Sequence, residues 1–150
     1  MVQWYSSVLY GLEEKPLWPA DSKVVTYRFI WMRSFHDQLS ITMDVQPEGD
    51  AQLRLQVFRR ISQQLVSRTQ SLSKEQVQEV LALIEEAKFW KMTTEGGRQG
   101  LDGAEWVLEG AKGGQYHVVT RWDAMDTTFG KALLELLRLS NYNPPKGEIY

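Results

Sequence analysis

The stretch SLSKEQVQEVLALIEEAKFW, residues 71–90, carries the clearest helix signal in the chain. Ser73 and Gln76 have the spacing of a capping box. Leu72 and Val77 can form a hydrophobic staple across it. The apolar residues that recur at helical spacing are Val77, Val80, Leu81, Ile84 and Ala87. The stretch therefore predicts an amphipathic helix that packs its apolar stripe on a sheet.

The chain on the N-terminal side of this helix alternates apolar and polar residues, which is the period of a β-strand. Three strands are predicted over residues 24–35, 39–45 and 52–61, and a weaker one, typical of a sheet edge, over 64–71. The connection QPEGDA, residues 46–51, has the composition of a turn. These segments predict an antiparallel meander of three to four strands.

The register of this meander follows from keeping its apolar residues on one face. We expect Trp31 to lie opposite Ile41. On the other face Arg28 then lies beside Asp44, and Arg54 reaches the same carboxylate from the third strand. Opposite charges paired across strands contribute about 0.2 to 1 kcal/mol each. The candidate interaction face on this side of the sheet comprises Arg28, Asp44, Arg54 and Phe58.

The chain on the C-terminal side of the helix begins with a glycine-rich loop over residues 96–103. Two alternating segments follow, GLDGAEWVLEG at residues 100–110 and GQYHVVTRW at residues 114–122. A three-residue loop over residues 112–114 joins them into a hairpin that keeps their aromatic faces together. Because no helix follows these glycines directly, they predict a turn into a hairpin and not a phosphate-binding loop.

The polar side of this hairpin carries the candidate chemistry. The predicted register pairs Glu109 with His117, and it pairs Glu105 with Arg121. In a catalytic interpretation, Glu105, Glu109 and His117 form an acid–base group, with Asp102 in the loop above it. A cation opposite each glutamate favours the ionised carboxylate, which cannot act as a general acid, so we favour charge-paired strands without a catalytic residue. The candidate ligand face here comprises Asp102, Glu105, Glu109, His117 and Arg121.

A second helix closes the chain. Asp126 or Thr127 can cap it, and its apolar stripe is Phe129, Ala132, Leu133, Leu136 and Leu137. The whole order predicts one α+β domain over residues 23–150. It contains an antiparallel three- to four-strand meander, a helix, a β-hairpin and a C-terminal helix, with the helices packed on one face of the sheet. Residues 1–22 are expected to form an aromatic arm that packs on this domain.

Composition limits the classes of function. Lysine and arginine total 17 against 19 aspartate and glutamate, a net charge of −2 without a basic run, which disfavours nucleic-acid binding. The chain has no cysteine, and its two histidines lack a metal-ligand spacing, so we expect neither a metal nor a cofactor. The first residues lack the pattern of a signal peptide or a membrane span. A cytoplasmic location fits the chain as given, and a periplasmic or envelope location fits if an N-terminal segment has been removed.

Several separated blocks carry a resemblance to a protein family. They are YRFIWMRSFH at residues 27–36, LSKEQVQEVLALIEEAKFW at 72–90, GLDGAEWVLEG and GQYHVVTRW. In this order they resemble a family of small bacterial proteins that share a GLDGxxWxxEG and YHxxxRW pattern. The resemblance covers residues 25–150 and implies a bacterial origin and a common fold. It implies no activity, because the family has none assigned.

Three functional hypotheses are open at this point. The first is a non-enzymatic protein-binding domain, for instance an immunity- or inhibitor-type bacterial protein, because interfaces favour aromatic residues and this chain has six Trp and six Tyr. The second is a small-ligand binder or hydrolase-like enzyme that uses the acidic and histidine residues around loop 96–103. The third is an accessory domain of a cell-envelope complex. Full burial of Trp31, Trp106 and Trp122, with no exposed aromatic patch left elsewhere, would remove most of the support for the first.

Overall fold

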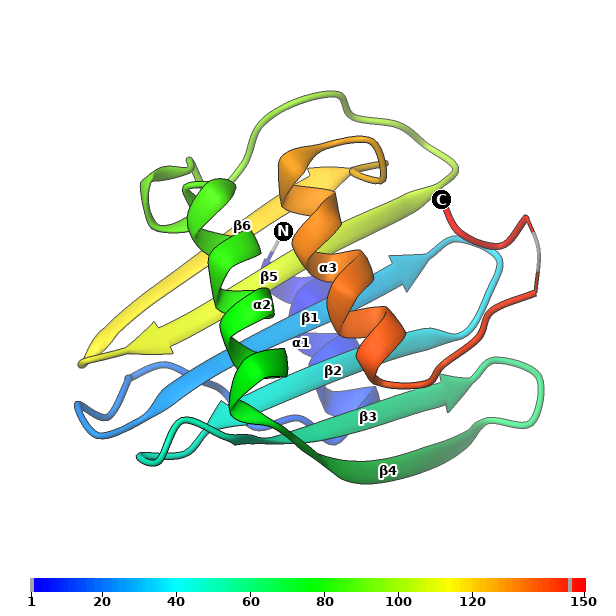
Figure 1. The fold of residues 1–150 in the computed structure, drawn as a ribbon. Coiled ribbons are helices and arrows are strands. Elements are labelled where there is room, and N and C mark those ends of the chain that lie inside the picture. Colours follow the sequence, from blue (N-terminus) through cyan, green and yellow to red (C-terminus); the bar gives the residue numbers. More distant parts are fainter. Residues whose placement is uncertain (1, 146) are drawn as a thin grey trace.

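A six-stranded antiparallel sheet forms the centre of the fold (Figure 1). The computed structural model describes residues 2–145 and 147–150, and the side chains of all these residues except 2–4. The predicted antiparallel α+β class is confirmed. The sheet has six strands, not three to four, because the hairpin pairs with the first strand and extends the meander. The strands are β1 (Val25–Arg33), β2 (Gln38–Val45), β3 (Ala51–Arg59), β4 (Gln64–Leu72), β5 (Ala104–Lys112) and β6 (Gln115–Trp122), in the order β4-β3-β2-β1-β5-β6.

Helices cover both faces of this sheet (Figure 1). Two of them, α2 (Lys74–Glu86) and α3 (Thr128–Leu139), pack side by side on one face, and α1 (Val2–Gly11) lies on the other. A short 3-10 helix, η1 (Phe89–Lys91), follows α2. The two predicted helices therefore share one face, as expected, and α1, a helix that the sequence did not predict within the arm, covers the other face.

α1 packs on this face because two even-numbered residues of β1 are apolar there. Ile30 and Met32 point away from the main core and form a second apolar patch. Leu9 of α1 and Leu12 just after it cover this patch, so all four side chains leave water. The arm thus packs on the domain, although two of its aromatic residues are exposed: Tyr10 and Trp18.

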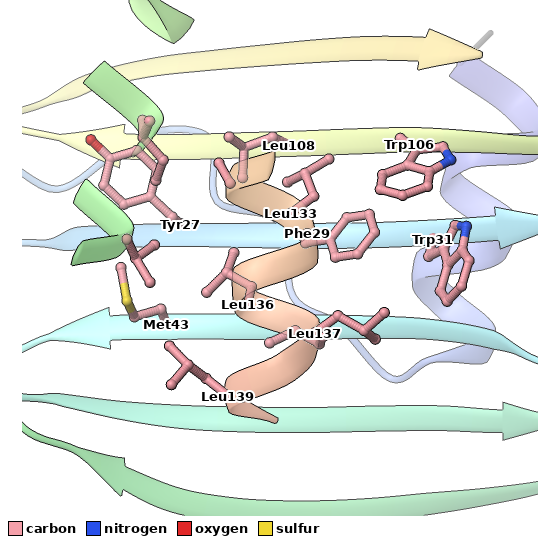
Figure 2. Packing of buried hydrophobic residues seen from close by; sticks show 14 of the residues in the cluster. Tyr27, Phe29, Trp31, Met43, Trp106, Leu108, Leu133, Leu136, Leu137 and Leu139 are labelled. Atoms are coloured by element: carbon pink, nitrogen blue, oxygen red, sulfur yellow. The ribbon is translucent and has the colours of Figure 1, made fainter. Parts of the chain in front are cut away.

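The main core lies between the sheet and the helices α2 and α3 (Figure 2). Trp31 and Trp106 are both fully buried there, and their ring centroids lie 5.6 Å apart. Each indole nitrogen donates to the main-chain oxygen of Tyr150. Figure 2 shows Leu133 of α3 over β1 and β5, the strands that carry these rings, and Leu137 and Leu139 of the same helix over β2 and β3. Two of the aromatic residues considered for an interface are therefore core residues.

Both predicted helix starts are confirmed. The side chain of Ser73 accepts from Gln76 N, and the side chain of Gln76 accepts from Ser73 N, which completes the capping box of α2. Thr127, not Asp126, caps α3, because its hydroxyl accepts from Gly130 N at 2.9 Å.

The predicted register between β1 and β2 is wrong by two residues. Trp31 pairs with Leu39, not with Ile41. The connection 34–37 is short, since two nitrogens of the Arg33 guanidinium donate to the main-chain oxygen of Asp37 and hold a tight turn.

This register changes the charged face of the sheet. Arg28 and Arg54 both lie opposite Thr42, whereas Asp44 lies opposite Thr26 and Gln52. The predicted ladder of Arg28, Asp44 and Arg54 is therefore not formed.

The predicted hairpin is present, but its turn has two residues and not three. Gly113 and Gly114 have φ of +56° and +78°, the positive values that the favoured two-residue hairpin turn requires. With one residue fewer in the turn, the pairing shifts by one residue, and each side chain of β6 points to the opposite face of the sheet from the one expected. As a result Glu109 lies opposite Val118, and His117 lies opposite Gly110. Similarly Glu105 lies opposite Trp122, so both predicted ion pairs of the hairpin are wrong.

Candidate functional site

The predicted site residues lie in two separate places. Arg28, Asp44 and Arg54 lie beneath the N-terminal arm, on the face of the sheet that α1 covers. Glu105 and Arg121 lie beside the glycine-rich loop, near the free edge of β6. Each place contains a hollow lined by charged side chains.

Arg28 is the centre of a buried charge network under the arm. Only 1% of its surface is exposed. Its Nε donates to Glu109 Oε2 at 2.6 Å, and its Nη2 lies 2.5 Å from a Glu109 carboxylate oxygen. Its Nη1 donates to Glu14 Oε2 at 3.2 Å and to the main-chain oxygen of Lys15 at 2.8 Å. Burial by itself lowers the pKa of Arg28, but Glu109 and Glu14 raise it above its ordinary value, so the guanidinium stays charged.

Glu14 connects the arm to three strands of the sheet. Its side chain is fully buried and contacts Arg28 on β1. It also accepts from Ser40 on β2 at 2.6 Å and from Arg54 on β3 at 2.8 Å. Two guanidinium groups and two carboxylates thus meet in one network whose charges balance. Sequence reasoning missed Glu14, because the segment GLEEKP, residues 11–16, has no periodicity that marks its second glutamate as buried.

Two tyrosines border the carboxylate of Glu109. The Tyr116 hydroxyl donates to Glu109 Oε1 at 2.7 Å. Burial raises the pKa of both Tyr116 and Tyr5 above the ordinary value, and the negative charge of Glu109 raises each further. Both hydroxyls therefore stay protonated well into the alkaline range.

We expect the free energy of unfolding to fall as the pH rises above about 10, the ordinary tyrosine pKa. The folded chain keeps these hydroxyls protonated, whereas the unfolded chain releases the protons, so the stabilisation is complete below pH about 10 and is lost above it. Urea unfolding at pH 8, 9, 10 and 11 measures this effect. In the Tyr116→Phe variant the fall should be shallower, and in the control Tyr10→Phe, at an exposed tyrosine, it should be unchanged. Equal slopes in Tyr116→Phe and the unmodified protein would contradict the expectation.

A hollow of about 310 Å³ opens beside the charge network. We name it the arm pocket. Its floor is a row of paired strand residues, with Thr42 between Arg28 and Arg54. Residues 13–15 and Leu17 of the arm form the wall that faces this floor. The remaining lining residues, Asp44 and Gln56, flank the row on β2 and β3.

A second hollow, of about 370 Å³, lies between the glycine-rich loop and β6, and we name it the loop pocket. Thr120 Oγ1 donates to Glu105 at its rim. Arg121 donates to the main-chain oxygens of Thr93 and Thr94, and burial lowers its pKa. The charged residues that line the loop pocket are Glu95, Arg98, Glu105 and Arg121.

The glycines of GLDG have a packing role beside this pocket. A Cβ at Gly100 would clash with Trp122 Nε1, and one at Gly103 would lie 2.8 Å from the same indole. Gly103 also has a φ of +144°. The loop therefore needs glycine at both positions to approach Trp122, which is half-buried beneath it.

The other predicted site residues do not join either group. Asp102 is exposed in the loop. His117 faces Trp90, with ring planes inclined by 27°, and its Nε2 lies 2.8 Å from the main-chain oxygen of Met92. Phe58 is half-buried and packs on the second apolar patch. A common acid–base group of Asp102, Glu105, Glu109 and His117 is not formed.

Comparisons add no assignment to these sites. No protein-family model and no curated protein matches the chain. Among the described residues, no three metal-ligating side chains are grouped closely enough to hold an ion. Within residues 2–145 and 147–150, no helix has the length and apolar character to cross a membrane.

Proposed function

We propose that this protein is a binding domain for another protein, which docks on one end of the sheet. We name this end the loop end and define it by the connections 34–37, 60–63 and 100–103. The first joins β1 to β2, the second joins β3 to β4, and the third leads into β5 beside β1. Because the sheet is antiparallel, all three lie at the same end of it. Loops held by a rigid sheet are a frequent location of binding residues.

Hydrogen bonds tie the three loops of the loop end together. Ser34 N donates to the main-chain oxygen of Gly103 at 2.9 Å, and Gly103 N donates to Ser34 Oγ at 3.2 Å. Arg60 donates from its main-chain nitrogen to Asp37 Oδ1 at 2.9 Å and from Nη1 to the main-chain oxygen of Ser34 at 3.2 Å. The loops therefore form a pre-organised surface, which lowers the entropy cost of binding.

Each loop presents one large apolar side chain to water, and this observation carries the proposal. The exposed fractions are 60% for Phe35, 98% for Ile61 and 97% for Leu101. Single exposed apolar residues are ordinary, but three on adjoining loops at one end form a group that a partner can desolvate. The three tryptophans considered from the sequence do not form an exposed patch, because Trp31 and Trp106 are buried and Trp122 is half-buried.

The side chains of the loop end indicate what kind of partner surface would fit it. The apolar group borders the loop pocket, since Leu101 directly follows Gly100 in its wall. The pocket offers two guanidinium groups and two carboxylates at the rim of the apolar group. The best match is a protein surface with an apolar centre and a charged side chain that enters the pocket. An immunity or inhibitor role is one form of this proposal, with a toxin or an enzyme as partner.

Site-specific crosslinking in the cells that make the protein tests the proposal. A photo-crosslinking amino acid is placed at Leu101, at Ile61 and, as control, at Lys112, which is exposed at the opposite end of the sheet. We expect one adduct of the same mass from positions 101 and 61 and none from position 112. Adding Phe35→Asp should reduce the yield at position 101 about tenfold or more, as for a central interface residue.

Two results would overturn the proposal. One is equal crosslinking at all three positions, and the other is a yield at position 101 that Phe35→Asp leaves unchanged. Circular dichroism of each variant confirms that the fold is intact, as expected for substitutions at exposed positions.

A further inference from the structure

The arm pocket contains buried polar atoms that the chain itself does not satisfy. Thr42 is 2% exposed, yet its Oγ1 has no hydrogen-bond partner among the described residues. Arg54 uses Nη2 for Glu14, while its buried Nε has no partner among the same residues. Both residues line the pocket. Because a buried donor without an acceptor is costly, the two groups together point to an acceptor that enters the pocket.

The charges around the pocket limit what that acceptor can belong to. The two guanidinium groups are already offset by two carboxylates, Glu14 and Glu109, so the floor offers no net charge to a dianion. The exposed wall residues Glu13 and Lys15 carry opposite charges and leave this balance unchanged. On the other side of Thr42, Asp44 accepts from Thr26 Oγ1 at 2.7 Å and forms no ion pair with a described residue. The pocket therefore has a donor side at Arg54 and Thr42 and a negative side at Asp44.

We propose that the arm pocket binds a small zwitterion of the amino-acid class. Its carboxylate accepts from Thr42 Oγ1 and Arg54 Nε, and its ammonium group lies against Asp44. The net charge of such a molecule is zero, which matches the balanced floor, and its two ends match the two sides of the pocket. The hollow of about 310 Å³ is at the small end of the range for ligand pockets, which fits a molecule of this size.

The site is complete only when the arm is docked on the sheet, because arm residues form part of its lining. Glu14 and Lys15 form one wall of the pocket, and both contact Arg28 on the floor. The ligand therefore lies between the arm wall and the sheet floor, and its binding should favour the docked arm. This site is at a different place from the loop end, so the two proposals stand or fall separately.

Calorimetric titration of the full chain with each of the twenty protein amino acids tests the proposal. Propionate and propylamine are titrated as the two separate halves of the ligand, and inorganic phosphate as a dianion. We expect at least one amino acid to bind with a Kd of about 1 mM or tighter. Each half, and phosphate, should bind at least about tenfold more weakly than that amino acid.

Two variants locate the site. Thr42→Val keeps the shape and removes the unsatisfied hydroxyl, so it should keep the Tm without ligand and weaken binding about tenfold. Asp44→Asn, at a half-buried position, should weaken binding by a similar factor through the ammonium end. The matched control is Thr69→Val, which lies opposite Arg54 on β4 and is exposed, and it should leave the Kd unchanged.

Three outcomes would overturn the proposal. The first is that no amino acid binds at a concentration of about 10 mM, tenfold above the expected Kd of about 1 mM. The second is that binding is equally strong in Thr42→Val and Asp44→Asn, which would place the ligand elsewhere. The third is that propionate or phosphate binds as tightly as any amino acid, which would make the pocket an anion site. If Thr42→Val fails to fold, the Asp44→Asn and Thr69→Val pair decides the location.

Discussion

Replacing Arg28 with alanine is expected to lower the free energy of unfolding by about 3 to 5 kcal/mol, which is the cost of breaking a buried ion pair from one side. The substitution leaves Glu109, which is 2% exposed, without a cation among the described residues. It leaves Glu14 with Arg54 alone. It also releases the main-chain oxygen of Lys15, so the arm loses part of its attachment. Urea denaturation followed by tryptophan fluorescence measures the loss.

A double variant separates the lost charge from the lost volume. Arg28→Met with Glu109→Gln removes both charges and keeps a similar volume, so it should recover most of the stability. Arg98→Ala, at an exposed arginine, is the matched control and should change the free energy of unfolding by less than about 0.5 kcal/mol. A loss below about 1 kcal/mol in Arg28→Ala would show that the network contributes no more than a surface ion pair.

Replacing Gly130 with alanine is expected to destabilise the protein by about 2 to 3 kcal/mol, in the range for overpacking. Gly130 lies in the first turn of α3, where a Cβ would clash with the main-chain oxygen of Ala124. That oxygen cannot withdraw easily, because it accepts from Thr127 N at 3.1 Å and from Thr127 Oγ1 at 2.6 Å. Relief of the clash would therefore break the cap of α3. Thermal and urea denaturation measure the loss.

Helix propensity by itself leads to the opposite expectation at this position. Glycine to alanine inside a helix stabilises by about 1 kcal/mol when nothing is in the way. At Gly11, the last residue of α1, an added Cβ would meet no atom within 4 Å. Gly11→Ala is therefore the matched control and should be neutral or stabilising. A Gly130→Ala variant as stable as the unmodified protein would contradict the close packing at Ala124.

The local signals in the sequence predict the structure correctly where it depends on near neighbours. The capping box of Ser73 and Gln76 involves residues three apart, and the apolar stripe of α2 recurs every three to four residues. The alternation of strand residues likewise predicts the meander and the hairpin. These features can be found because both partners of each interaction lie within one element.

Registers and faces are the points at which sequence reasoning goes wrong. A hairpin turn of two glycines in place of three residues exchanges the faces of β6, so one residue decides whether His117 meets Glu109. The sequence indicates Arg28 and Glu109 as candidate residues but not their relation, because they are 81 positions apart and belong to strands whose pairing only the fold defines.

The α+β class, the strands and the starts of α2 and α3 can be predicted from local sequence, because hydrogen bonds and side-chain periodicity within each segment suffice for these. Three features depend on contacts between distant segments: α1 covers the second face, Glu14 enters the charge network, and three loops meet at one end. These features depend on which surfaces remain uncovered once the sheet is complete. A charge such as that of Glu14 can be buried only where cations pair with it, and here Arg28 and Arg54 do so.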